Sequence, residues 1–171
     1  DDDGLTLQDD LRRLEDWEDL WQMKFHPGKC QVIRFTRKRK PLERSYLLHN
    51  VPLDTVPEIK YLGVTFRENL KWNSHIDNMT SKANQTLGFV RRNLRISSPV
   101  IKERAYKGLV RPKVEYASTV WNPYTVHHTH KIEMVQRRAT RWVLNRHHNT
   151  SSVTDMLDHL GWRTLKDRRI D

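Results

Sequence analysis

Cysteine, glycine and long apolar runs are all scarce in this sequence of 171 residues. The single Cys30 excludes an internal disulfide framework and any cysteine-rich zinc module. The six glycines leave little room for a glycine-rich phosphate loop, and no Ser-His-Asp order or nucleophile elbow is present. No stretch approaches the roughly 18 continuous apolar residues that span a bilayer, and no signal-peptide pattern opens the chain. We therefore expect a soluble intracellular protein with no membrane attachment.

Positive charge is abundant instead, and it is unevenly distributed along the chain. The formal net charge is +10, but residues 1–23 hold nine acids against two arginines, which leaves +17 for residues 24–171. Such an excess attracts polyanions, and the attraction weakens as salt is added. Only 36% of the residues are apolar and 30% are charged, yet six tryptophans argue against a disordered chain. The charge indicates a nucleic-acid partner, with an inert solubilising surface as the alternative.

The first 69 residues predict one helix and a few short strands. Apolar residues recur at helical spacing near the start, and His26-Pro27-Gly28 breaks the pattern. The helical stripe comprises Leu7, Leu11, Leu14, Trp17 and Trp21. Strand-like runs follow at residues 30–35, 45–49 and 59–66. We expect a small antiparallel sheet with one helix packed on it.

Beyond residue 70 the apolar period changes from two to 3.6, which predicts helices. A first stripe runs from Ile76 to Leu94, with Asn73 or Ser74 as the N-cap. Ser98-Pro99 begins a second helix, which Pro112 interrupts. Its expected inward residues are Ile101, Ala105 and Leu109. A third helix is expected over residues 131–145, with Ile132, Val135, Ala139 and Trp142 buried, and a fourth over 153–160, closing on Gly161. The fold class is therefore α+β, with the sheet region at 1–69 and an all-α bundle at 70–171.

Two clusters have residue types that bind metals. Asp1 to Asp3 stand directly before a helix, where acids favour the helix dipole, rather than on a rigid strand that would fix a two-metal geometry. His127, His128 and His130 gather after Pro123, and His147 and His148 follow the third expected helix. Structural zinc sites usually combine histidine with cysteine, however, and Cys30 is the only thiol. We predict no metal site from either cluster.

Arginines gather on two of the expected helices, away from the apolar stripes. The first group is Arg91, Arg92 and Arg95, and the second is Arg137, Arg138 and Arg141. Two such helices could line a groove for a phosphate backbone. The alternative is ordinary solubilising charge, together with arginines that favour the C-terminal ends of helix dipoles.

The order of several short motifs resembles one family. The sequence has Leu7-Gln8, Trp21-x-Met23-Lys24-Phe25, Lys60-Tyr61-Leu62-Gly63-Val64, Leu70-Lys71-Trp72, Leu109-Val110-Arg111-Pro112, Val135-Gln136-Arg137-Arg138-Ala139 and Leu160-Gly161-Trp162. Their joint order and spacing resemble the reverse transcriptases of non-LTR retrotransposons, the long-interspersed-element type, close to its jockey-like branch. No single motif is specific, but the resemblance covers nearly the whole chain.

The resemblance implies a place within a larger RNA-directed DNA polymerase. Residues 1–69 resemble the last part of the palm, and residues 70–171 resemble the helical thumb. The strand with the catalytic Tyr-x-Asp-Asp motif precedes the position that matches Asp3, so we expect this fragment alone to be inactive as a nucleotidyltransferase. Magnesium would serve the complete polymerase, with no cofactor held by this chain. The implied partners are an RNA template, a DNA primer and the remaining palm and fingers of the polymerase.

Two segments match functional parts of the family. Lys29 matches a lysine in a neighbourhood that can protonate departing pyrophosphate, although a surface lysine at a strand start is the alternative. Tyr61-Leu62-Gly63 matches the primer-grip hairpin, in which a tight turn presses on the primer strand. Gly63 would permit that close approach, and a hairpin with Leu62 and Val64 packed inside is compatible with it.

Two other origins of the sequence stay open. One is a non-enzymatic basic nucleic-acid-binding or adaptor protein derived from such a transposable element, and the other is a decayed relic. Because the implied target is chromosomal DNA, and because Arg37 to Lys40 form a basic run, we expect a nuclear location with a cytoplasmic ribonucleoprotein stage.

Overall fold

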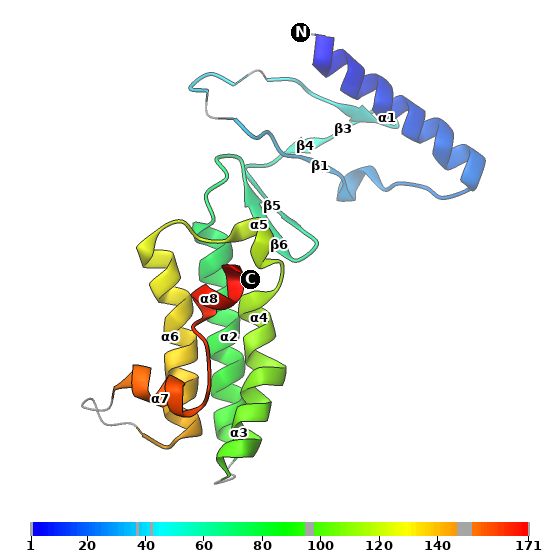
Figure 1. Ribbon diagram of the computed structural model, residues 1–171. Coiled ribbons are helices and arrows are strands. Elements are labelled where there is room, and N and C mark those ends of the chain that lie inside the picture. The colour runs from blue at the N-terminus through cyan, green and yellow to red at the C-terminus, as the bar shows by residue number, and fades with distance from the viewer. Residues whose placement is uncertain (1, 37, 42, 95–97, 147–151, 171) are drawn as a thin grey trace. The chain divides into compact units, whose positions relative to one another are not determined.

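The computed structural model describes residues 2–36, 38–41, 43–94, 98–146 and 152–170. The chain divides into two compact units, Asp1–Lys71 and Trp72–Asp171. Unit 1 combines one long helix with short strands, and unit 2 is helical, so the α+β class is confirmed (Figure 1). Whether the two units are a palm end and a thumb stays a prediction.

Unit 1 opens with the expected helix, α1 (Asp2–Trp21). The side that packs inward, however, is not the apolar stripe. The Gln8 side-chain amide donates to the carbonyl of Leu47 (3.0 Å) and accepts from its N–H (2.9 Å), so it pairs with the strand as a backbone would. On the same side of α1 the Glu18 side chain is buried, while most of the predicted stripe is exposed. The expectation of an apolar packing face was wrong because polar groups of α1 satisfy strand backbone groups.

Among the described residues of unit 1, the strands form three separate two-stranded ladders rather than one antiparallel sheet. They are β1 (Gln31–Val32) with β4 (Asp54–Thr55), β2 (Leu47–Leu48) with β3 (Val51–Pro52), and β5 (Glu58–Tyr61) with β6 (Val64–Arg67). The β1–β4 pair is parallel, against expectation, because the long connection 33–53 returns the chain in the same direction. A short 3₁₀ turn, η1 (Pro27–Lys29), precedes β1. The two-residue ladders are shorter than the predicted runs 30–35 and 45–49.

Unit 2 is built on two long helices, α2 (Asn73–Asn93) and α6 (Val126–Val143), which lie side by side (Figure 1). A third rod consists of α3 (Pro99–Ala105), the π-helical turn η2 (Tyr106–Val110) and α4 (Arg111–Glu115). The predicted apolar residues Ile132, Val135 and Ala139 of α6 are fully buried, as expected. The short helices are α5 (Ser118–Trp121), α7 (Val153–His159) and α8 (Leu165–Ile170).

The first half of the rod that contains η2 packs with a different face from the predicted one, while Val110 and Val114, which continue the expected stripe, are buried. Ile101 and Leu109 are exposed, and the buried side chains recur at every fourth position. They are Lys102, Tyr106, Val110 and Val114. The same rod contains a π-turn, in which the Arg111 N–H donates five residues back to the carbonyl of Tyr106. The proline expected to interrupt the helix, Pro112, lies in the first turn of α4, where its missing N–H is tolerated.

Several helix ends differ from their predicted positions. The N-cap of α2 is Trp72 rather than Asn73 or Ser74, and Ser98 precedes α3 without a side-chain cap bond. Helix α6 begins at Val126, earlier than predicted, because the Thr125 hydroxyl accepts from the His128 N–H. Helix α7 ends before Gly161, whose φ of +60° suits glycine, as expected.

A buried histidine should make the stability of unit 2 depend on pH. His75 lies between the rings of Trp72 and Trp121, and burial together with the nearby Lys82 lowers its pKa below the ordinary 6.5. The unfolded chain therefore binds more protons than the folded one as pH falls below about 6.5, and stability should be lost there. We expect His75→Phe to reduce this loss, measured as the difference in urea midpoint between pH 7 and pH 5. An unchanged difference would contradict the prediction.

Candidate nucleic-acid interface

The predicted primer-grip segment forms a tight β-hairpin in unit 1. Strands β5 and β6 pair antiparallel up to Tyr61 and Val64, which leaves Leu62 and Gly63 as a two-residue turn. Both turn residues have positive φ, +46° at Leu62 and +85° at Gly63, as a type I′ turn requires. The glycine therefore stands where its conformational freedom is needed, and Val64 is buried, as expected.

The side chains at the hairpin tip face outward. Tyr61 is 62% exposed and Leu62 is 72% exposed, so the expectation of a packed Leu62 was wrong. A leucine in the left-handed region costs roughly 1–2 kcal/mol, and asparagine or glycine would fill the position more favourably. An exposed apolar residue held in a costly conformation does not serve the stability of the hairpin, which is typical of a functional position.

Lys29, the proposed proton donor, ends the η1 turn of unit 1 and is exposed. Its N–H donates to the carbonyl of His26 (2.8 Å), and the Cys30 N–H donates to that of Pro27 (3.0 Å). These bonds fix the backbone at the lysine while the side chain meets solvent. The catalytic role of Lys29 stays a prediction.

A polar groove runs between α2 and α6 in unit 2. The Lys131 ammonium pairs with the Asp77 carboxylate (2.5 Å), and the Arg138 guanidinium donates to the Asn84 side-chain oxygen (3.0 Å). Both pairs join residues 54 positions apart, so the two helices run in the same direction at constant register. The hollow between them has a volume of about 460 Å³. Its lining comprises Asp77, Thr80, Ser81, Asn84, His127, His130, Lys131, Met134 and Arg138.

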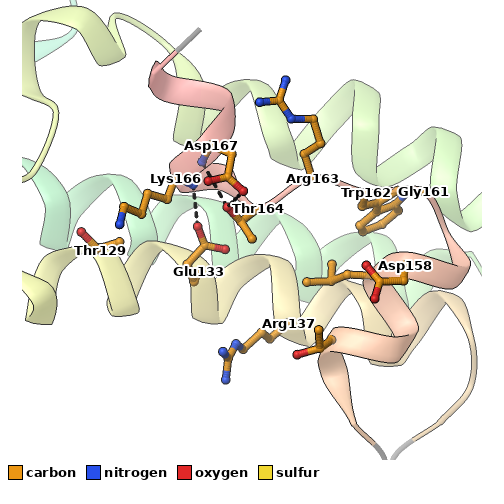
Figure 2. Close-up of a pocket in the computed structure, with 12 residues that line it drawn as sticks. Thr129, Glu133, Arg137, Asp158, Gly161, Trp162, Arg163, Thr164, Lys166 and Asp167 are labelled. Atoms are coloured by element: carbon orange, nitrogen blue, oxygen red, sulfur yellow. Dashed lines mark hydrogen bonds between the residues drawn. The ribbon is translucent and has the colours of Figure 1, made fainter.

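Arg137 lies in a different hollow, formed by α6, α7 and α8 (Figure 2). Its volume is about 570 Å³, and its charged lining is balanced: Arg137, Arg163 and Lys166 stand against Glu133, Asp158 and Asp167. The Glu133 carboxylate accepts from the Lys166 N–H (2.7 Å), and Thr164 and Asp167 bond across the start of α8 (2.6 Å). The structure thus separates Arg137 from Arg138, although they are adjacent in the sequence.

The other predicted arginines are placed as follows. Arg91 and Arg92 are exposed in the last turn of α2, and Arg141 is half-buried in the last turn of α6. Arg95 lies outside the described residues. Sequence reasoning did not single out Lys131, Asn84 or Asp77 of the groove. The one available signal was an acid and a lysine in the first turns of two expected helices, which does not reveal that they meet.

The described part of the chain contains no set of side chains that could hold the metal ions of a complete polymerase. There, no three His, Cys, Asp or Glu side chains are arranged to hold a metal ion. The His128 ring nitrogen Nδ1 lies 2.8 Å from the Thr125 hydroxyl, and burial together with His127 lowers the pKa of His128. These histidines thus belong to the start of α6, while His147 and His148 lie outside the described residues.

None of the described helices combines the length and apolar character needed to cross a membrane.

Comparison with known proteins gives three relatives, all from flies. The chain is 29% identical over 139 residues to a probable RNA-directed DNA polymerase from transposon BS of Drosophila melanogaster, covering 79% of this chain. It is 23% identical to the corresponding probable polymerase from the X-element of the same fly, and 27% identical to the RNA-directed DNA polymerase from mobile element jockey of Drosophila funebris. Each of these two matches spans 143 residues and 80% of this chain.

The matched region is a small part of each relative. The chain spans 15% of the length of each of these polymerases. No family model and no solved structure matches the chain. The resemblance noted in the sequence motifs is nonetheless confirmed: over about 80% of its length, this chain is related to the RNA-directed DNA polymerases of jockey-like non-LTR retrotransposons.

Proposed function

We propose that this chain is the part of a non-LTR retrotransposon reverse transcriptase that holds the RNA template and the DNA primer. Its relatives are RNA-directed DNA polymerases, and residues 24–171 carry a net charge of +17 that favours a nucleic-acid partner. On this proposal units 1 and 2 are a palm end and a thumb. Polymerisation itself would need catalytic aspartates and magnesium supplied by other parts of the enzyme.

The observation that carries the proposal is the tip of the β5–β6 hairpin. A type I′ turn presents Leu62 and the backbone of Gly63 outward, on two short paired strands that limit their movement. A tip of this shape suits contact with a primer strand, because Gly63 lets the backbone approach closely and Leu62 offers an apolar surface to a sugar. Lys29 would act in the same complete enzyme, by donating a proton to the leaving pyrophosphate.

The proposal is tested by the affinity of the purified chain for an RNA–DNA primer–template across a salt series. We expect binding whose log K falls linearly with log salt concentration, because each contacted phosphate releases counterions. Leu62→Asn should lower the affinity about tenfold, since it removes the apolar contact of one leucine. The same change should stabilise the hairpin by about 1 kcal/mol, because asparagine followed by glycine is a favoured type I′ pair.

A matched control comes from the end of the same unit. Leu70 is also an exposed leucine with positive φ (+54°), but it lies after β6, outside the hairpin. Leu70→Asn should therefore give a similar stabilisation without a loss of affinity. Absence of binding at low salt by the folded chain would overturn the proposed function. Equal affinity losses in the two variants would show that the hairpin tip does not contribute to nucleic-acid binding.

A further inference from the structure

A small cavity lies where the rod formed by α3, η2 and α4 meets α6 and the segment 161–168. Its volume is about 180 Å³. Two buried aromatic side chains form part of its wall, Tyr106 and Trp162, whose rings stack with their centroids 4.6 Å apart. The full lining comprises Tyr106, Lys107, Arg111, Gln136, Gly161, Trp162, Arg163 and Arg168. Residues 161–163 also border the hollow that contains Arg137, but the other residues of this cavity do not.

The charged residues of this lining are all cations. They are Lys107 of η2, Arg111 of α4, Arg163, and Arg168 of α8. Two acids pair with them from outside the lining. Glu103 pairs with Lys107 (2.5 Å between Oε1 and Nζ). Glu115 pairs with Arg168 (2.5 Å between Oε1 and Nε). Because none of the described acids lines the cavity itself, the space between these cations favours an anion.

Arg111 has hydrogen-bonding capacity that the described part of the protein does not use. Its Nε is buried without a hydrogen-bond partner there, and its ion pair with Glu115 is long, 3.5 Å between Nε and Oε2. The same carboxylate lies much closer to Arg168. A guanidinium carries five N–H donors in a planar fork that matches the oxygens of a phosphate. Arg111 is therefore well suited to bind an oxyanion in the cavity.

Two buried polar side chains complete the lining. The Gln136 side chain donates from Nε2 to the carbonyl of Arg163 (2.9 Å), and its oxygen accepts from the Tyr106 hydroxyl at 3.4 Å. The second hydrogen bond is long, so the hydroxyl loses little by turning to a better acceptor. Burial raises the pKa of Tyr106 above its ordinary value of 10, so the hydroxyl keeps its proton and remains a donor. The cavity thus combines a neutral donor with its cations, which suits a ligand with several acceptor oxygens.

We propose that this cavity binds a small inorganic oxyanion of the phosphate type. Its volume offers room for about six water molecules, at the roughly 30 Å³ that each occupies in the liquid, so it accommodates a phosphate ion but not a whole nucleotide. Arg111 and Lys107 contact the ion from the rod, and Arg168 contacts it from α8. The bound ion joins the rod to the segment 161–168 and so holds α8 in place. This binding requires no nucleic acid, and its test is independent of the proposed function.

The test is a titration of the full chain with sodium phosphate at constant ionic strength. The readouts are the NMR signals of the Trp162 indole N–H and of the Gln136 side-chain amide, because both residues line the cavity. We expect saturable shifts with a dissociation constant on the order of 1 mM, as a few charge-assisted hydrogen bonds imply. Arg111→Gln should weaken binding about tenfold. Lys113→Gln removes the same charge from an exposed position of α4 outside the lining, and it should change the affinity by less than about twofold.

A second variant covers the case in which Arg111→Gln does not fold. Lys107→Gln removes a lysine that lines the cavity, and it should weaken phosphate binding about threefold to fivefold, against the same control Lys113→Gln. Hydrogen exchange separates binding from the general stabilisation of proteins by phosphate, which is excluded from their surfaces. General stabilisation would slow exchange throughout unit 2 and equally in all variants. A bound ion should slow exchange mainly in α8, and less so in Lys107→Gln.

Three results would overturn the proposal. The first is the absence of shifts, or shifts that never saturate, in the folded wild-type chain. The second is an equal effect of Lys107→Gln and Lys113→Gln, which would mean that phosphate only screens the surface charge. The third concerns the source of the phosphate group: tighter binding of phenyl phosphate than of inorganic phosphate would overturn the assignment to a free ion.

Discussion

Replacing Trp121 with alanine is expected to cost unit 2 about 3–5 kcal/mol of its free energy of unfolding. The Trp121 side chain ends α5 and is fully buried. Its indole N–H donates to the carbonyl of Tyr116 (2.8 Å), and its ring lies 5.4 Å from that of His75. Alanine would leave a cavity of nearly the whole ring and remove the donor from the Tyr116 carbonyl.

The measurement is hydrogen exchange of the α2 and α6 amides, which reports on unit 2 alone, supported by urea unfolding of the full chain. Trp121→Phe should have an intermediate effect, because it keeps part of the volume but loses the N–H. Tyr124→Ala, at an exposed position three residues along, should change stability by less than about 0.5 kcal/mol. If Tyr124→Ala and Trp121→Ala had the same effect, Trp121 would not be the packing centre that its burial indicates.

The second large effect is expected at Glu18 in unit 1. Its carboxylate is only 1% exposed, and it accepts hydrogen bonds from the Phe25 N–H and from the His49 ring (2.6 Å). One acid thus ties the end of α1 to the segment that follows it and to the β2–β3 turn. Glu18→Ala should cost about 3 kcal/mol, because the partners lose a charged acceptor in a buried place.

The readout is exchange protection in the 22–25 segment and in β2 and β3, which should fall while unit 2 keeps its protection. Asp19→Ala is the matched control, since it removes the same charge from the neighbouring, exposed residue of α1. Comparable losses in the two variants would mean that net charge, rather than the buried contacts of Glu18, stabilises unit 1.

The long helices could be predicted because their apolar residues repeat every 3.6 residues over many helical turns. Ile76, Ala83 and Leu87 of α2, and Ile132 and Val135 of α6, are buried as that period requires. The η2 turn could not be predicted, because an i→i+5 hydrogen bond leaves no distinct residue pattern. The burial of Lys102 in place of Ile101 was not predicted either, since a lysine is an unusual core residue. In unit 1 the apolar stripe of α1 gave a wrong prediction of the packed side. The hydrogen bonds of Gln8 and Glu18 determine which side of α1 packs against the strands.

The candidate site was predicted less completely than the helices. The hairpin turn was recognisable, since Gly63 marked it, but the exposure of Leu62 follows from a turn conformation that the sequence pattern did not reveal. Arginine-rich helices were recognisable too. Their division into a basic groove with Arg138 and a balanced hollow with Arg137 depends on which helices flank α6, which periodicity alone does not give.

The constant 54-residue separation between the two sides of the groove has a consequence for how the protein is made. Helix α2 is synthesised first. Its partner α6 follows only after the whole α3–α4 rod, which brings the chain back to the end of the unit where α2 begins. Closing so long a loop costs conformational entropy before any contact across the groove compensates for it. A nascent or truncated chain that stops before Val126 would still carry Arg91 and Arg92, but it would lack Lys131 and Arg138 of α6. The ion pair and hydrogen bond that join the two sides of the groove would then form only in the finished unit.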